Sequence, residues 1–136
     1  MDYLAVGLAG FLGAVARVLV AKYIRLGYSG DFPVNTLTVN LTGSFFLCFF
    51  MLIALKRLRI SPRLRLAVGT GFCGAYTTFS TFSLESINLL REGRVFIAFT
   101  YIVITAFGCV VFGLLGASIG RLFTRHEKRV EGIQSE

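Results

Sequence analysis

A run of hydroxyl and aromatic residues near the middle of the chain is the segment best suited to chemistry. It reads Thr-Phe-Ser-Thr-Phe-Ser over residues 78–83. On a helix, Phe79 and Phe82 share one face, and Ser80 and Thr81 lie on the adjacent stripes. Phenylalanine rings have positive edges, so two ring edges could face an anion without holding it as tightly as a full charge would. The alternative is that both rings pack in a core.

Two further polar residues lie inside apolar segments. Asn40 carries an amide with two donors, and at membrane depth such a group turns toward another helix or a wet cavity. It could therefore make an interhelical hydrogen bond or line a polar path. Arg17 is the one full charge inside an otherwise apolar stretch. It could extend to the nearer interface, or it could set a positive potential over a vestibule that attracts anions.

The main chain itself offers a second kind of chemistry. Gly74 to Thr77 reads Gly-Ala-Tyr-Thr and could be unwound. Unwound backbone exposes carbonyl oxygens, which coordinate Na⁺ in broken transmembrane helices. Farther along, Tyr101, Thr105 and Cys109 are spaced by four and form one weakly polar stripe. A threonine on such a stripe can equally bond to its own helix.

The elements that would position these residues are membrane spans. The chain has 136 residues, of which 55% are hydrophobic and 14 are phenylalanine. Such a composition predicts one transmembrane domain over residues 1–136, because a single soluble core could not bury that much apolar surface. We expect an all-α membrane protein whose four transmembrane helices cover about 3–24, 34–55, 64–90 and 95–123, with a charged tail over 124–136. Glycines and hydroxyl residues predict a break in the third helix, mid-membrane, near 69–77.

Small residues mark where the helices should pack. Gly10 and Ala14 are four apart, and so are Gly116 and Gly120. Lipid provides no hydrophobic drive between helices, so close approach at small residues must hold them together. We therefore expect the first and fourth spans to pack through these positions.

The basic residues are placed as in a membrane protein. The net charge is +7, and four spans put both termini and the middle loop on one side. That side would hold Lys56, Arg57, Arg59, Arg63, Arg65, Arg121, Arg125, Lys128 and Arg129, against Lys22, Arg25, Arg91 and Arg94 on the other. The bias favours cytoplasmic termini. Flanking a bilayer explains the basic residues without a nucleic-acid partner.

Three classes of function remain open from the residues alone. A passive anion channel suits the uncharged polar segment. A small proton-coupled exporter of the multidrug type would need an intramembrane carboxylate, yet Asp2 and Asp31 lie at span edges and Glu85 is off-centre. A membrane scaffold would use the hydroxyls only to join helices. An enzyme is not expected, because the sequence shows no nucleophile–base pair or metal triad.

Three motifs together resemble the small bacterial fluoride channels of the Fluc or CrcB family. They are Gly10-x-x-Gly13-Ala14-x-x-Arg17, Thr36-Leu-Thr-Val-Asn40-Leu-Thr-Gly43 and Gly71-Phe-Cys-Gly74-Ala-Tyr-Thr-Thr-Phe-Ser-Thr-Phe-Ser83-x-Glu85. The match covers nearly the whole chain, and the third motif is highly specific.

The resemblance implies an antiparallel, dual-topology homodimer with two pores in the bacterial inner membrane. It would export fluoride passively from the cytoplasm and so relieve fluoride toxicity. The resemblance also implies a structural Na⁺, not transported, bound at the dimer centre by main-chain oxygens of Gly74 and Thr77. Pore or fluoride-binding roles would fall to Phe79, Phe82, Asn40, Ser80, Thr81, Tyr101, Thr105 and Arg17.

The sequence departs from the family pattern in two places, and its charges raise a third question. Gly74-Ala75 stands where the resembled family often has a Gly-Gly pair. Cys109 lies on the weakly polar stripe at a position where that family has a serine. A thiol is a weaker donor than a hydroxyl. The charge bias is awkward for subunits that must insert both ways. Either insertion tolerates the bias, or a paralogous partner of opposite orientation exists.

Overall fold

The computed structural model describes residues 2–28, 30–56 and 60–133. Residues 57–59 of the predicted basic loop and 134–136 of the predicted charged tail lie outside the described residues. The described elements are α1 (Asp2–Gly27), α2 (Val34–Lys56), α3 (Pro62–Leu66), the π-helix η1 (Ala67–Cys73), α4 (Gly74–Tyr76), α5 (Phe79–Arg91) and α6 (Val95–Ile133). The prediction of an all-α protein is confirmed.

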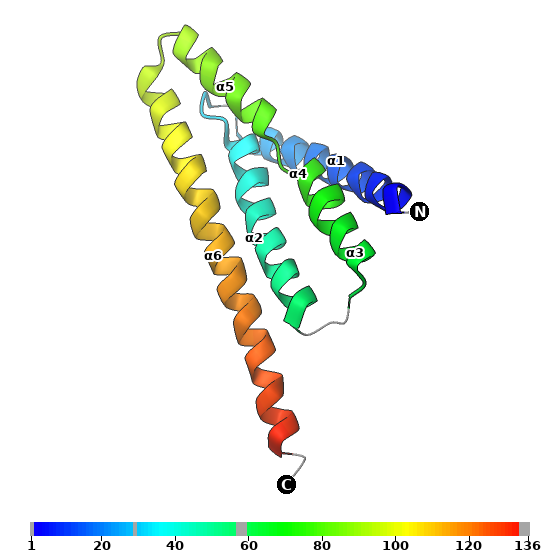
Figure 1. Cartoon of the computed structure of the whole chain (residues 1–136). Helices are drawn as coiled ribbons and strands as arrows, with labels where there is room; N and C mark the ends of the chain where they lie inside the picture. Colours follow the sequence, from blue (N-terminus) through cyan, green and yellow to red (C-terminus); the bar gives the residue numbers. More distant parts are fainter. Residues whose placement is uncertain (1, 29, 57–59, 134–136) are drawn as a thin grey trace.

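Three helices are long and apolar enough to cross a membrane. They are Asp2–Ile24, Val34–Leu55 and Val95–Thr124. The segment predicted as the third span is not one long helix like the other three. It consists of the successive elements α3, η1, α4 and α5. In Figure 1, α2 lies alongside α6, and the segment from α3 to α4 runs beside α2 and leads on into α5.

Glycines let the helices approach closely, as the small-residue spacing predicts. A Cβ added at Gly116 on α6 would meet the carbonyl carbon of Phe45 on α2 at 3.0 Å. A Cβ added at Gly113, one turn earlier, would lie 3.2 Å from the Sγ atom of Cys48. Gly13 on α1 packs in the same way against the backbone of Phe72 in η1. Since a backbone atom cannot swing away, the contacts at Gly116 and Gly13 require glycine, whereas Gly113 meets a side-chain sulfur at a tight distance.

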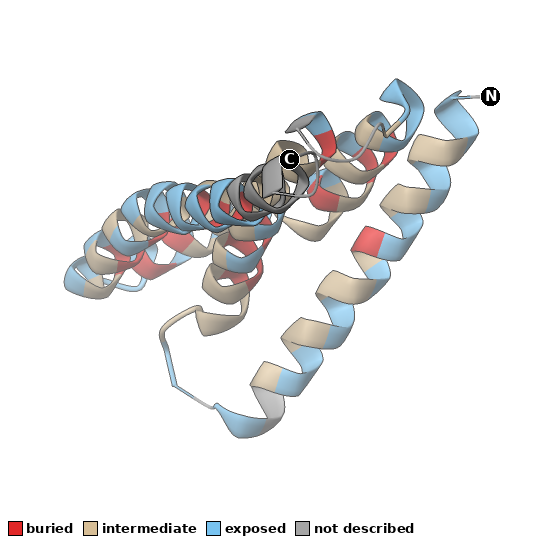
Figure 2. Cartoon of the chain, turned by 90° about the horizontal axis from the view of Figure 1, so that it is seen from below, coloured by how far each residue is buried: buried red, intermediate tan, exposed pale blue. Residues whose placement is uncertain are grey.

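The outer surface of the molecule is apolar. Figure 2 shows α1 exposed or half-buried along nearly its whole length, and Gly13 is the buried residue among those described on this helix. Large apolar side chains such as Phe11 and Phe107 are exposed on α1 and α6. Exposed apolar side chains in such number are suited to contact with lipid or a partner chain.

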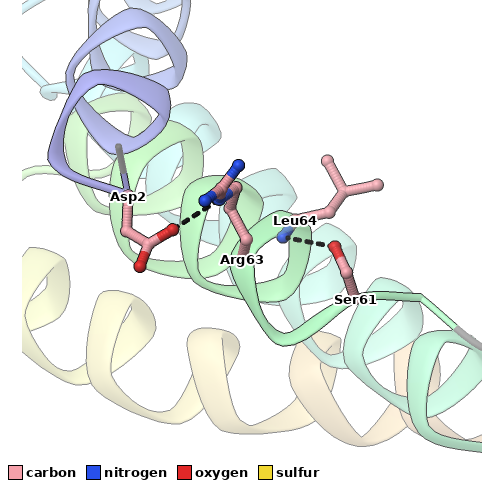
Figure 3. Close-up of polar contacts among 4 residues, drawn as sticks. All are labelled: Asp2, Ser61, Arg63 and Leu64. Atoms are coloured by element: carbon pink, nitrogen blue, oxygen red, sulfur yellow. Dashed lines mark hydrogen bonds and ion pairs between the residues drawn. The ribbon is translucent and has the colours of Figure 1, made fainter.

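Polar contacts fasten the ends of the helices. Ser61 caps α3 by accepting a hydrogen bond from the Leu64 amide at 3.3 Å, and Arg63 pairs with Asp2 at the start of α1 (Figure 3). At the other end, Arg94 pairs with Asp31 at 2.7 Å between Nη1 and Oδ1. This hydrogen bond holds the pKa of the Arg94 guanidinium above its ordinary value. The α5–α6 turn needs Gly93, whose φ is +75°.

Candidate functional site

The helical path is interrupted between α4 and α5. Thr77 has φ −78° and ψ 161°, and Thr78 has φ −148° and ψ 119°, so both residues are extended. The helix resumes at Phe79. Upstream, η1 is a seven-residue π-helix, a conformation that is rare and concentrated at functional sites. The irregular backbone therefore starts earlier than the two extended residues alone suggest.

Asn40 joins α2 to this interruption. Its Nδ2 donates to the Thr78 carbonyl at 3.1 Å, and the Thr78 amide donates back to Asn40 Oδ1 at 2.8 Å. Both residues are buried, each with 8% of its surface exposed. The interhelical bond, one of the two roles open for Asn40 from sequence, is thus present. Asn40 also lines a cavity, so the two roles coexist.

Thr78 caps the start of α5. Its Oγ1 accepts a hydrogen bond from the Thr81 amide at 3.2 Å and donates to Thr81 Oγ1 at 2.9 Å. Ser80 Oγ lies 3.3 Å from the same Thr78 oxygen. The hydroxyls of Ser80 and Thr81 therefore meet at the helix cap, and neither residue lines the cavity beside Asn40.

A cavity of about 380 Å³ lies at the interruption and is bordered by α2, η1, α4, α5, α6 and the extended link between α4 and α5. Its lining residues are Asn40, Gly43, Ser44, Leu47, Gly69, Cys73, Gly74, Thr77, Thr78, Phe79, Phe82, Thr105, Ala106 and Cys109. The structure thus brings together most residues that the sequence singled out, although they come from separate elements of the chain.

The two phenylalanines differ in their surroundings. Phe79 is 80% exposed, so its ring is not part of a core within one chain. Phe82 is half-buried and packs against Tyr101, with ring centroids 5.2 Å apart and planes at 52°. The two phenylalanine centroids are 5.8 Å apart. Both rings line the cavity, from adjacent turns of α5.

The stripe on α6 divides into two parts. Thr105 and Cys109 line the cavity. Thr105 is buried, and its Oγ1 has no hydrogen-bond partner within the described part of the chain. Such an orphaned hydroxyl is costly unless something outside the chain binds it. Tyr101 is fully buried and does not line this cavity; its hydroxyl is used elsewhere.

The carboxylate of Glu85 accepts a hydrogen bond from the Tyr101 hydroxyl. Tyr101 donates to Glu85 Oε2 at 2.8 Å, and Thr36 donates to Oε1 at 3.0 Å. Sequence reasoning missed the role of Thr36, although its position four residues before Asn40 places both on one face of α2. Thr36 and Glu85 border a second hollow of about 610 Å³, together with Lys22 and Thr81.

Arg17 stands apart from the other candidates. It is half-buried on α1 and lines neither the cavity at the interruption nor the hollow beside Lys22. No ion pair joins it to another described residue within 4.0 Å. Any effect of Arg17 on an ion in the cavity would therefore act through space rather than through contact.

Main-chain oxygens are the ligands the site offers a cation. Within residues 2–28, 30–56 and 60–133 no three His, Cys, Asp or Glu side chains gather as a metal site. Gly74 and Thr77 line the cavity where the helix ends. Carbonyls at a helix end lack intrahelical partners, and such oxygens suit a hard cation.

The chain matches known proteins over almost its full length. Residues 4–117 match the family model described as CrcB-like protein, Camphor Resistance (CrcB). Two similar proteins are each called fluoride-specific ion channel FluC 2. One, from Carboxydothermus hydrogenoformans, is 41% identical over 100% of this chain and 99% of its own. The other, from Geobacillus kaustophilus, is 42% identical over 98% of this chain and 99% of its own.

A third similar protein with the same name, from Listeria innocua, is 44% identical over 91% of each chain. The family predicted from the three motifs is thereby confirmed. The long apolar helices agree with that family, and the chain is a multi-pass membrane protein. By the extent of the family match and the identity to these relatives, the chain belongs to the CrcB-like family.

Proposed function

We propose that this chain forms a passive, fluoride-selective channel that exports fluoride from the cytoplasm and so relieves its toxicity. The names of the three relatives support fluoride as the ion. The observation that carries the proposal is the orphaned hydroxyl of Thr105, buried beside a cavity that two phenylalanine rings also line. It is an uncharged donor awaiting an acceptor.

This cavity suits a small, strongly hydrated anion. A pore must replace the water around such an ion with good donors, yet bind weakly enough to release it. Thr105 offers one hydroxyl, and the Asn40 amide keeps one N–H beyond the one given to Thr78. The ring edges of Phe79 and Phe82 add weak positive charge. The N-terminus of α5 also lies at this cavity, and the backbone amides at a helix N-terminus attract anions.

Charge at the approaches would assist entry. We assign Arg17 and Lys22 to a vestibule in which their positive potential raises the local concentration of anions. Tyr101, whose hydroxyl is held by Glu85, would act by fixing the ring of Phe82 rather than by touching the ion. Ser80 and Thr81 would shape the start of α5 through Thr78.

The proposed assembly is an antiparallel homodimer with a Na⁺ at its centre, in the bacterial inner membrane. Two features support it: Phe79 and Gly74 are exposed in the single chain, and both border the cavity. A second copy would cover them. The break would then lie mid-membrane, and the carbonyls of Gly74 and Thr77 would hold the ion. The bound Na⁺ would supply a fixed positive charge that stabilises these carbonyl dipoles.

Export follows from the membrane potential, which is negative inside and drives anions outward. A proton-coupled exporter of the multidrug type would instead need a carboxylate that titrates during transport. Glu85 accepts hydrogen bonds from two hydroxyls and does not line the cavity beside Asn40. The arrangement therefore favours the passive channel.

Flux from proteoliposomes separates these functions. Vesicles loaded with fluoride are studied at pH 7 to 8 with valinomycin and K⁺ setting the voltage, and a fluoride electrode reads efflux. We expect efflux well above that of empty vesicles and independent of an imposed pH gradient. Fluoride efflux that follows the pH gradient at fixed voltage would contradict the passive channel and support proton-coupled transport, and no fluoride efflux above that of protein-free vesicles would leave the multidrug-type exporter as the alternative.

A further inference from the structure

We propose that Asn40 and Thr78 are positioning residues that keep the main-chain carbonyls of Gly74 and Thr77 free to coordinate a hard monovalent cation. The inference rests on the proposed Na⁺ site and names the side chains that create it. Neither side chain needs to touch the cation. Each acts by taking an amide that would otherwise block a carbonyl.

The argument starts from the bonding of a continuous helix. There, each amide donates to the carbonyl four residues earlier. The Thr78 amide would therefore cover the Gly74 carbonyl, and the Thr81 amide would cover the Thr77 carbonyl. A covered carbonyl has its best-placed lone pair occupied and is a poor cation ligand.

Side chains divert both of these amides. The Thr78 amide donates to Asn40 Oδ1 at 2.8 Å. The Thr81 amide donates to Thr78 Oγ1 at 3.2 Å. One diversion reaches across 38 residues to α2, and the other is a local helix cap. Together they release carbonyls three residues apart.

The residue before the interruption shows ordinary helical bonding. The Thr77 amide donates to the Cys73 carbonyl at 2.9 Å, four residues earlier. Helical pairing thus ends within one residue, where Asn40 intervenes. Asn40 also donates to the Thr78 carbonyl at 3.1 Å, so both the oxygen and the nitrogen of its side-chain amide bind the backbone of Thr78. A hydrophobic side chain of similar size could do neither.

Gly74 is exposed in the single chain, and the proposed second copy would cover it; a released carbonyl that is covered in this way is costly unless something binds it. Gly74 and Thr77 both line the cavity, so a ligand has room to reach them. Unwound carbonyls and half-helix C-terminal ends are the ligands that hold Na⁺ in other broken transmembrane helices. These oxygens carry no formal charge, which favours a monovalent cation over a divalent one.

The test is cation-dependent stability of the full chain, purified in detergent. Melting is recorded in NaCl and in choline chloride at equal ionic strength. A ligand that binds only the folded state raises its stability with concentration, so we expect Na⁺ to raise the melting temperature of the wild type. Thr78→Val and Asn40→Leu should lose that Na⁺-dependent rise. Thr78→Ser, which keeps the hydroxyl, should retain it.

Thr38→Val is the matched control. The Thr38 hydroxyl donates to the Val34 carbonyl within α2 at 2.8 Å, so its removal leaves the interruption intact. We expect the full Na⁺ response in this variant. A full response in both Thr78→Val and Asn40→Leu would overturn the inference while leaving the proposed channel in place.

A direct measurement covers the case in which those variants do not fold. The carbonyl carbon of Gly74 is labelled in the wild type and followed by NMR as NaCl replaces choline chloride. A Na⁺-dependent shift of this resonance supports the inference, and an unmoved resonance overturns it. A wild type that melts equally in both salts overturns the cation site and this inference together, and fluoride efflux then tests the channel independently.

Discussion

Helix α2 contacts α6 on one face and the start of α5 on another, and the two contacts are of different kinds. Toward α6 the helices pack closely at glycines, which have no side chain: Gly116 lies against the Phe45 backbone, and Gly113 lies against Cys48. Toward α5 the contact is made by polar side chains: Asn40 is bonded twice to Thr78, and Thr36 donates to Glu85. The first contact rests on close packing at glycines, whereas the second supplies hydrogen bonds to the backbone of Thr78 that the interrupted helix does not.

The difference separates stability from function. Close packing is the main attraction between helices in lipid, while hydrogen bonds between membrane helices contribute only about 0.6 to 2 kcal/mol each. Damage to the α2–α6 face should therefore lower the stability of the protein. Damage to the Asn40 face should leave a folded protein whose ion path or cation site is impaired. The predictions below test this division, from the largest expected effect to the smallest.

Gly116→Ala should cause the largest loss of stability. The added methyl group would meet the Phe45 backbone, which cannot move aside, and overpacking costs about 1 to 3 kcal/mol. Gly7→Ala is the matched control, because a Cβ there meets nothing within 4 Å. Thermal unfolding in detergent measures both. Equal melting temperatures for the two variants would contradict the packing account of this face.

Phe82→Ile should slow fluoride efflux by about tenfold, equivalent to about 1.4 kcal/mol in the barrier. The ring edge is lost, and so is the contact with Tyr101 at 5.2 Å. Phe79→Ile should slow efflux as well but melt like the wild type, since its ring is 80% exposed. Size-exclusion chromatography checks that both variants keep the oligomer. Wild-type rates in both would remove the ring edges from the mechanism.

Thr105→Val should lower the fluoride rate without destabilising the fold. The buried Oγ1 has no partner among the described residues, so replacing it with a methyl group removes an unsatisfied atom at almost constant shape. The melting temperature should hold or rise slightly while efflux falls. A variant with reduced stability and unchanged efflux would make Thr105 a structural residue.

Cys109→Ser should have the smallest effect, a fluoride rate equal to or a few times above that of the wild type. A hydroxyl is a better donor than the thiol it replaces, and Cys109 lines the cavity. Cys48→Ser is the control, because Cys48 is not among the lining residues. Slower efflux in Cys109→Ser than in Cys48→Ser would mean that the serine is not the stronger donor to the ion.

The long spans and the family could be predicted from sequence because their signals are local. Apolar length predicts helices such as Val34–Leu55, and motif spacing identifies the family. The small residues at Gly116 and Gly10 were also readable, since their spacing of four to a second small residue is enough. Phe79 and Phe82 were found as a pair because one helix turn sets their distance.

The partners across the fold could not be predicted, because spacing says nothing about contacts between segments far apart in the chain. Asn40 meets Thr78 across 38 residues, and Thr36 meets Glu85 across 49. From sequence, the Asn40 amide could face a helix or a cavity, and the structure gives it both. Arg17 shows the reverse limit: its charge marked it for the site, yet α1 keeps it away from the cavity.

The most direct test of the central claim compares fluoride with chloride efflux through the wild type and Phe82→Ile, reconstituted at equal protein density. The account predicts fast fluoride efflux from wild-type vesicles, chloride efflux near that of empty vesicles, and a clear fall in the fluoride rate for Phe82→Ile. Fluoride efflux from wild-type vesicles no faster than from protein-free vesicles would contradict it.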